Sequence, residues 1–208
     1  MKMKKTAVII SVLFVFFLGL TGISQAVVLL TKEQALKQVF PDVDQVTTET
    51  ITLTSAEVAK IKSRLGGQLV HYQAGSQSGK VNETINYTFY IGIKNNKQVG
   101  VAVIEEQPGK WGPVDFIIAL SPNPGKIKNM AVMAYQEKRG RPIARNNFLD
   151  QFTGKGSSDP IALNKDIRAI SGATISSDAT CFAVKKVLAL YEEAFLPRLQ
   201  GGSLSLKK

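Results

Sequence analysis

Short runs of alternating apolar and polar residues dominate the middle of this chain and predict β-strands. The runs cover residues 46–53, 68–74, 84–93, 98–105, 114–120 and 127–135. Turn-forming segments separate several of them, namely Lys94-Asn-Asn-Lys97, Pro108-Gly109 and Pro122-Asn-Pro-Gly125. Because tight turns connect antiparallel neighbours, we expect a mainly antiparallel sheet.

Two capping boxes predict short helices before and between the first of these strands. Thr31-Lys-Glu-Gln34 opens one helix, which should end near Phe40, and Thr54-Ser-Ala-Glu57 opens another, which should end at Gly66. Both place a threonine three residues ahead of a side chain that reaches back to the backbone.

The clearest helical pattern lies near the C-terminus. Apolar residues recur every three or four positions at Ala179, Ala183, Val187, Leu190 and Ala194. The pattern predicts a helix from Asp178 to Leu196, capped by Ser176, Ser177 or Asp178, ended by Pro197 and packed on the sheet. The fold class is therefore α+β, a single domain with a twisted, mainly antiparallel sheet packed with helices.

The N-terminus has the pattern of an export signal. Three lysines within Met1–Lys5 precede an apolar run from Ala7 to Leu20, and Ser24-Gln-Ala26 supplies small residues for cleavage after Ala26. An uncleaved membrane anchor is the alternative, because no charged residue occurs between Lys5 and Lys32. Both interpretations place the rest of the chain outside the cytoplasm.

Charge and composition narrow the function classes. The formal net charge is +10, but the basic residues are scattered and not interleaved with aromatics, which argues against nucleic-acid binding. Cys181 is the only cysteine, so this chain alone cannot form a disulfide, a CxxC pair or an iron–sulfur cluster. We expect a buried thiol there. His71 is the only histidine, which excludes a histidine-rich metal site.

The segment Ser171-Gly-Ala-Thr-Ile-Ser-Ser177 places small and hydroxylated residues directly before the predicted helix. Gly172 and Ala173 allow close approach of a ligand, and a helix N-terminus attracts anions. A plain capping loop explains the same residues, so both interpretations stay open on these features alone.

The hexapeptide Ser171-Gly-Ala-Thr-Ile-Ser176 resembles the flavinylation motif of the FMN-binding domain family, found in flavin-carrying subunits of sodium-pumping quinone reductase and the Rnf complex and in stand-alone exported proteins. Trp111-Gly-Pro113 and the strands up to Tyr135 extend the resemblance, which covers roughly residues 87–196. One departure is Glu137-Lys-Arg-Gly140, where the transporter subunits have Glu-Thr-Pro-Gly. In this respect the chain is more similar to the stand-alone members.

The resemblance implies that a separate flavin transferase joins the phosphate of FMN to the hydroxyl of Thr174. The implied cofactor-binding residues are Thr174, Ser171, Gly172, Ala173, Ile175, Ser176, Ser177, Trp111, Glu137, Arg139 and Lys155. Lys155 or Arg139 would offset the phosphate charge. Trp111 is expected either to stack on the flavin or to lie in the core, and Glu137 either to contact the flavin or to be an ordinary surface carboxylate.

The expected function is an exported FMN carrier in extracytoplasmic electron transfer, with membrane redox proteins as donor or acceptor, rather than a substrate-specific enzyme. Two alternatives remain: a non-covalent flavin or phosphate-ligand binding module, and a flavin-dependent reductase of a small extracellular acceptor. The expected segments are a signal peptide (1–26), N-terminal helices and strands (27–83), the FMN-binding domain (84–198) and a loose tail (199–208).

Overall fold

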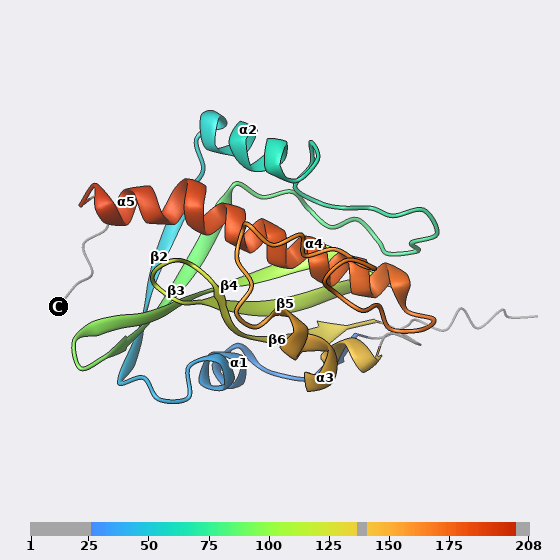
Figure 1. The fold of residues 1–208 in the computed structure, drawn as a ribbon, viewed down its shortest axis with the longest axis horizontal. Helices are drawn as coiled ribbons and strands as arrows, with labels where there is room; N and C mark the ends of the chain where they lie inside the picture. The colour runs from blue at the N-terminus through green and yellow to red at the C-terminus, as the bar shows by residue number, and fades with distance from the viewer. Residues whose placement is uncertain (1–25, 137–140, 203–208) are drawn as a thin grey trace, which may run out of the picture.

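The computed structural model describes residues 26–136 and 141–202, which form one antiparallel sheet with helices on both faces (Figure 1). The strands are β1 (Val27–Val28), β2 (Gln45–Thr52), β3 (Asn86–Lys94), β4 (Lys97–Pro108), β5 (Pro113–Leu120) and β6 (Ile127–Tyr135). The helices are α1 (Lys32–Val39), α2 (Ser55–Arg64), α3 (Asn146–Leu149), α4 (Thr174–Leu190) and α5 (Leu196–Gln200), with shorter turns at Arg141–Ala144, Asp150–Phe152 and Tyr191–Phe195.

The sheet has the strand order β1-β6-β5-β4-β3-β2, and every neighbouring pair is antiparallel. Strands β3 to β6 form a simple meander, as the tight turns between them predicted. Strand β2 pairs with β3 along its whole length, from Gln45 opposite Ile93 to Thr52 opposite Asn86. Residues 27–83 and 84–198 therefore share one sheet, which confirms a single α+β domain. The boundary at residue 83 stays a prediction.

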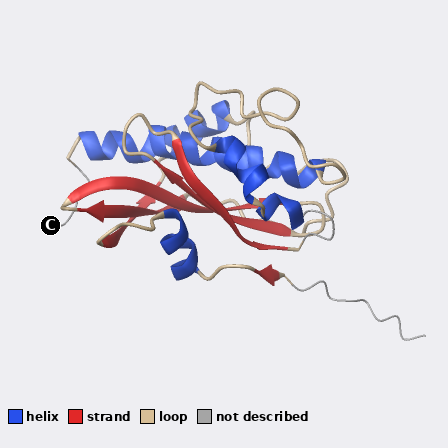
Figure 2. Ribbon diagram, turned by 60° about the horizontal axis from the view of Figure 1, so that its bottom comes forward, coloured by secondary structure: helices blue, strands red, loops and turns tan. Residues whose placement is uncertain are grey.

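The helices divide unequally between the two faces of the sheet. Helix α4 lies across one face with α2 beside it, and α1 covers part of the other (Figures 1 and 2). The predicted stripe of α4 is buried, since Ala183, Val187 and Leu190 are each 0% exposed. Burial of three such side chains stabilises the fold by several kcal/mol, at about 25 cal/mol per Å² of apolar surface.

Both predicted capping boxes are present. Thr31 accepts at its hydroxyl from the Gln34 N–H, and the Gln34 side chain accepts from the Thr31 N–H. Thr54 and Glu57 make the same reciprocal pair at the start of α2. Local sequence decides these helix starts because the partners lie only three residues apart.

The strand predicted over residues 68–74 is wrong. This segment is an irregular coil whose backbone bonds to a side chain rather than to another strand. The Gln107 amide donates to the Leu69 carbonyl at 3.3 Å and accepts from the His71 N–H at 3.1 Å. A buried glutamine on β4 thus satisfies backbone groups that would otherwise need a neighbouring strand.

The predicted bounds of the long helix are also wrong. Helix α4 begins at Thr174 rather than Asp178, with Ala173 at the N-cap, so Ser176, Ser177 and Asp178 lie inside the helix. At the other end a π-helical turn, Tyr191–Phe195, carries the chain into α5. The Leu196 N–H bonds to the Tyr191 carbonyl five residues back, and this wider turn accommodates Pro197, which lacks an N–H.

A buried ion pair links α4 to the sheet. The Lys186 ammonium lies 2.7 Å from the Glu105 carboxylate, and both side chains are 4% exposed. The Gln107 amide donates to the same carboxylate at 2.7 Å. Burial raises the pKa of Glu105, and Lys186 acts against that shift.

Cys181 is buried, as the sequence predicted. Burial and the neighbouring Asp178 raise the pKa of its thiol to about 12, so the thiol is protonated at neutral pH.

Candidate functional site

A tight turn leads directly into α4. The Ala173 N–H donates to the Ile170 carbonyl at 3.0 Å, and Gly172 has a φ of +75°. Only glycine adopts this left-handed conformation without strain, so Gly172 is required for the turn. The turn brings the chain out of an extended approach and places Thr174 at the first position of the helix.

The Ser177 hydroxyl holds this turn against the helix. It accepts from the Ile170 N–H at 3.2 Å and donates to the Ala173 carbonyl at 2.9 Å, and the residue is 0% exposed. Ser177 is therefore a structural residue of the motif, which the sequence pattern alone did not separate from its neighbours.

Thr174 is exposed, and the helix behind it has no side-chain cap. Helices α1 and α2 each begin with a threonine capping box, whereas Ala173 offers α4 no side-chain acceptor. The N–H groups of the first turn of α4 therefore favour an external acceptor, and the helix dipole adds positive potential. Ser176 supplies a further polar atom, since its hydroxyl is buried without a hydrogen-bond partner among the described residues.

The coil predicted as a strand braces this helix terminus. The Gln73 amide donates to the Ile175 carbonyl at 2.8 Å. A few residues on, the Ser76 hydroxyl donates to the Gly109 carbonyl at 2.5 Å and the Gln77 N–H to the Lys110 carbonyl at 2.6 Å. Residues 73–77 thus connect the start of α4 to the β4–β5 turn.

The β4–β5 turn carries Trp111, which is half-buried with the Lys110 ammonium 5.4 Å from its ring centre. The turn packs against the end of β6, because an added Cβ at Gly112 would come within 2.7 Å of Gln136 Cδ. Gln136 directly precedes Glu137. The structure therefore brings Trp111 and the approach to Glu137 to the same end of the sheet as Thr174, while Glu137 and Arg139 themselves lie outside the described residues.

We expect Gly112→Ala to lower the free energy of unfolding by about 1–3 kcal/mol, because the new methyl group overlaps Gln136 and must displace it. Urea denaturation measures the loss. Gly79→Ala is the matched control, since a Cβ there meets nothing within 4 Å, and should change stability by less than about 0.5 kcal/mol. Equal stability of both variants would contradict the close packing at Gly112.

His71 and Asp178 form a polar pair beside the motif that the sequence did not reveal. The His71 Nε2 lies 3.2 Å from the Asp178 carboxylate, its Nδ1 lies 2.5 Å from the Gln68 amide nitrogen, and its ring stacks on Phe182. Because the amide nitrogen donates, Nδ1 accepts and Nε2–H donates to Asp178. Residues 107 positions apart meet here, so no local pattern could have found the pair.

Lys155 does not come to the Thr174 hydroxyl in this structure. Its ammonium pairs with Asp166 at 2.9 Å, and its carbonyl accepts from Ile127, at the end of β6 opposite Tyr135. Burial opposes ionisation of Asp166, but the Ala162 and Ile161 N–H groups and Lys155 outweigh it and lower the pKa of Asp166 to about 2.

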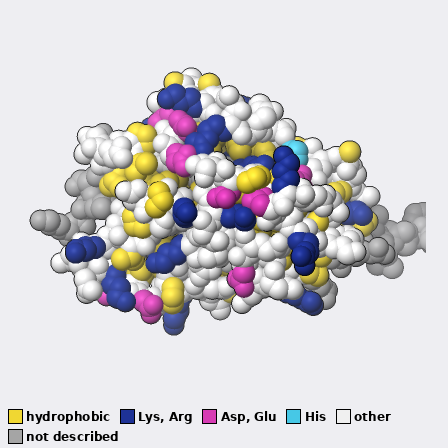
Figure 3. All heavy atoms as spheres, in the orientation of Figure 1, with side chains coloured by type: hydrophobic (Ala, Val, Ile, Leu, Met, Phe, Trp, Pro, Cys, Tyr) yellow, Lys and Arg dark blue, Asp and Glu magenta, His cyan; other side chains and the backbone are white. Residues whose placement is uncertain are grey.

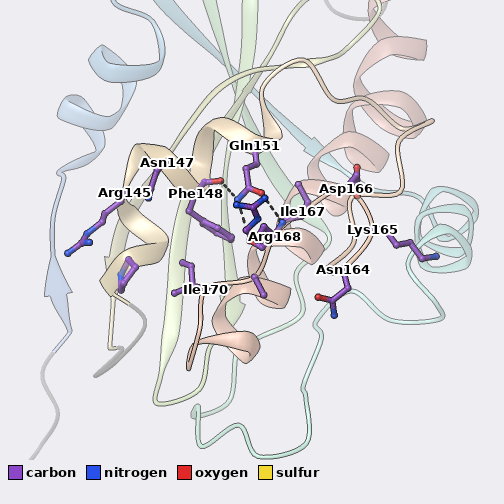
Figure 4. Close-up of a pocket in the computed structure, with 12 residues that line it drawn as sticks. Arg145, Asn147, Phe148, Gln151, Asn164, Lys165, Asp166, Ile167, Arg168 and Ile170 are labelled. Atoms are coloured by element: carbon purple, nitrogen blue, oxygen red, sulfur yellow. Dashed lines mark hydrogen bonds between the residues drawn. The ribbon is translucent and has the colours of Figure 1, made fainter.

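A hollow of about 830 Å³ borders the turn on its other side (Figure 4). Ile170, the first residue of the turn, is part of its wall. The lining residues are Pro142, Arg145, Asn147, Phe148, Gln151, Asn164, Lys165, Asp166, Ile167, Arg168, Ala169 and Ile170. Its volume lies within the usual range for sites that bind small molecules or cofactors.

Comparison with known proteins assigns this region to a family. Residues 109–189, which include Trp111, the hollow and Thr174, match the model of the FMN-binding domain. The chain carries an FMN-binding domain. FMN is accordingly the cofactor that this domain binds. An anion-accepting helix start beside an exposed hydroxyl and a large hollow fits a phosphate-bearing cofactor of this size.

One curated relative of the FMN-binding domain is a component of the proton-translocating ferredoxin:NAD(+) oxidoreductase complex of Clostridium ljungdahlii. It is 29% identical over 108 residues, covering 48% of this chain and 57% of the relative. The chain thus aligns with just over half the length of that protein.

The crystal structure of NqrC from Shewanella oneidensis has the same fold as this chain. The TM-score is 0.52 at 16% sequence identity, covering 79% of this chain and 88% of that one. In residues 26–136 and 141–202, no helix is both long and apolar enough to cross a membrane.

Proposed function

We propose that this chain is an exported flavoprotein that carries FMN through a phosphoester to Thr174 and transfers electrons outside the cytoplasm. The observation that carries the proposal is the exposed Thr174 hydroxyl at an uncapped helix start, within the region that matches the FMN-binding domain. The fold supplies a rigid base for it, because α4 is buried along most of its length.

The first turn of α4 is the part of the site that would hold the phosphate. A phosphoester on Thr174 retains one negative charge, which the N–H groups and dipole of the helix stabilise. The buried Ser176 hydroxyl is a further donor in that turn. Ser171 and Gly172 are exposed in the turn, so their side leaves the Thr174 hydroxyl open to a transferase.

The hollow beside Ile170 is our proposed position for the isoalloxazine ring. Phe148, Ile167 and Ile170 offer apolar contacts, and Asn147 and Gln151 offer polar ones. Residues 137–140 connect Gln136 to the segment that forms the hollow, so Glu137 and Arg139 remain predicted contacts of the flavin. Trp111 stays a predicted contact from the opposite wall. Bound FMN supplies the electron-accepting chemistry, and the protein supplies attachment and orientation.

The partners follow from the same proposal. A flavin transferase would attach FMN, and membrane redox proteins would donate or accept electrons. The N-terminal pattern supports export, and the relative from Clostridium ljungdahlii supports a redox context, because it belongs to an oxidoreductase complex. The proposed location is the periplasmic or extracellular face of the membrane.

The intact mass of the protein tests the proposal directly. We expect protein made in bacteria with a co-produced flavin transferase to lack residues 1–26 and to gain one FMN less one water. Protein made without the transferase should lack the gain. Yellow colour that disappears on denaturation would instead indicate a non-covalent flavin-binding module, and rapid turnover of one small acceptor would indicate a reductase.

A further inference from the structure

The hollow beside the flavin turn is strongly cationic. Arg145, Lys165 and Arg168 are exposed in its lining, and none of the three side chains forms an ion pair with a described residue. Asp166 is the only acidic residue in the lining, and Lys155 already neutralises it at 2.9 Å. Three positive charges therefore surround the recess without a compensating acid.

Gln151 holds these charges on a fixed frame. Its amide donates to the carbonyls of Phe148 and Arg168, both at 3.3 Å, and accepts from the Arg168 N–H at 2.8 Å. Figure 4 shows this bridge in the centre of the hollow, with Arg145 and Lys165 projecting to opposite sides. The segment from Arg168 then runs through Ala169 into the turn that presents Thr174.

We propose that this cationic hollow is the docking surface for an acidic redox protein, which exchanges electrons with the flavin at its edge. The inference rests on the proposed function, because it needs a flavin at Thr174. Clustered positive charges around a recess increase the local concentration of an anionic partner and its association rate. A partner bound there lies next to the turn that carries the cofactor.

The lining favours a protein over other anions. The exposed large apolar residues of the described chain are Val27, Val28, Leu29, Tyr72 and Ile85, and none lines the hollow. The hollow therefore has no apolar anchor for a membrane surface. Its one aromatic side chain, Phe148, is 3% exposed and offers no face for stacking bases.

General positive charge must be separated from this local cluster. Lys and Arg side chains are spread over the face shown in Figure 3 as well. Lys37, Lys94 and Lys97 are a matched control set, because they are exposed at the other end of the sheet and form no ion pair within the described chain. Replacing either set by glutamine removes three charges.

Stopped-flow reduction of the flavinylated protein by fully reduced flavodoxin, an acidic protein, measures the docking. Two flavodoxins each give up one electron, and the FMN takes up both with a proton from the buffer. At an ionic strength of about 10 mM, where the Debye length is about 30 Å, the variant Arg145→Gln/Lys165→Gln/Arg168→Gln should react about tenfold more slowly than the parent. The control variant Lys37→Gln/Lys94→Gln/Lys97→Gln should change the rate less than about twofold.

Oxidation of the reduced protein by cytochrome c, a basic protein, gives the opposite sign. Two cytochromes each accept one electron, and the hollow variant should react faster than the parent at low salt. Equal slowing by both variants with flavodoxin would show a general charge effect and overturn the inference, as would an unchanged rate in the hollow variant.

Binding without flavin separates this inference from the proposed function. Thr174→Ala protein should still bind flavodoxin at low salt, measured by calorimetry, and should lose about tenfold in affinity when the three hollow cations are replaced. Protein that binds in this way but never acquires covalent flavin would contradict only the proposed attachment. Flavinylated protein with no cation-dependent binding would contradict only the docking surface.

Discussion

Thr174→Ala should abolish covalent flavin in protein co-produced with a flavin transferase. The substitution removes the only hydroxyl that the structure exposes at the first position of α4, and it leaves a residue that favours helix. Flavin fluorescence of the denatured protein band measures the loss, and a mass spectrum of the peptide containing residue 174 identifies the modified atom. We expect complete loss rather than a partial decrease, because an ester cannot form without the oxygen.

Neighbouring substitutions distinguish the hydroxyl from shape. Thr174→Val keeps the branched shape without the nucleophile and should carry no flavin, whereas Thr174→Ser keeps a hydroxyl and should retain some. Ser171→Ala is the matched control, since Ser171 is exposed two residues before the turn ends and should still allow labelling. Ser176 and Ser177 are each 0% exposed, out of reach of a transferase. Modification mapped to Ser171, or full fluorescence in Thr174→Ala, would overturn the assignment.

Lys186→Met should lower the free energy of unfolding by about 3–5 kcal/mol at neutral pH, because it leaves the buried Glu105 carboxylate without its counter-charge. Gln107 alone then contacts that carboxylate. Denaturant unfolding of the variant and the parent measures the difference. An exposed pair would be a poor predictor, but both side chains here are 4% exposed.

The sign of the pH dependence identifies the cause. In Lys186→Met, burial holds the pKa of Glu105 above its unfolded value of about 4, so the folded state binds the extra proton. The deficit should therefore be small below about pH 4 and grow as pH rises through the folded pKa. Glu105→Gln/Lys186→Met should recover most of the loss and show little pH dependence. A deficit that is equal at all pH values in the single variant would point to lost packing instead.

Local chemistry was enough to predict much of this protein. The capping boxes at Thr31 and Thr54 act over three residues, and the turn residues between β3, β4, β5 and β6 act over two or three, so sequence alone determined those helix starts and the antiparallel meander. The motif around Thr174 was recognisable for the same reason, since its glycine and hydroxyl are close together in the chain.

Tertiary structure decided the features that depend on distant partners. Residues 68–74 have strand-like sequence but became coil, because Gln107 on β4 occupies their backbone groups. Helix α4 extends back to Thr174 because the Ser177 hydroxyl ties its first turn to Ile170, a contact that a pattern of caps cannot specify.

The same reason explains what the sequence left out of the site. His71 meets Asp178 and Lys186 meets Glu105 across long stretches of chain, and Arg145 shares a hollow with Arg168 only after the segment behind β6 has folded back. Sequence determined which residue can receive the cofactor. The packing of distant segments decided which charges surround it, because electrostatic interactions depend on distance in space rather than along the chain.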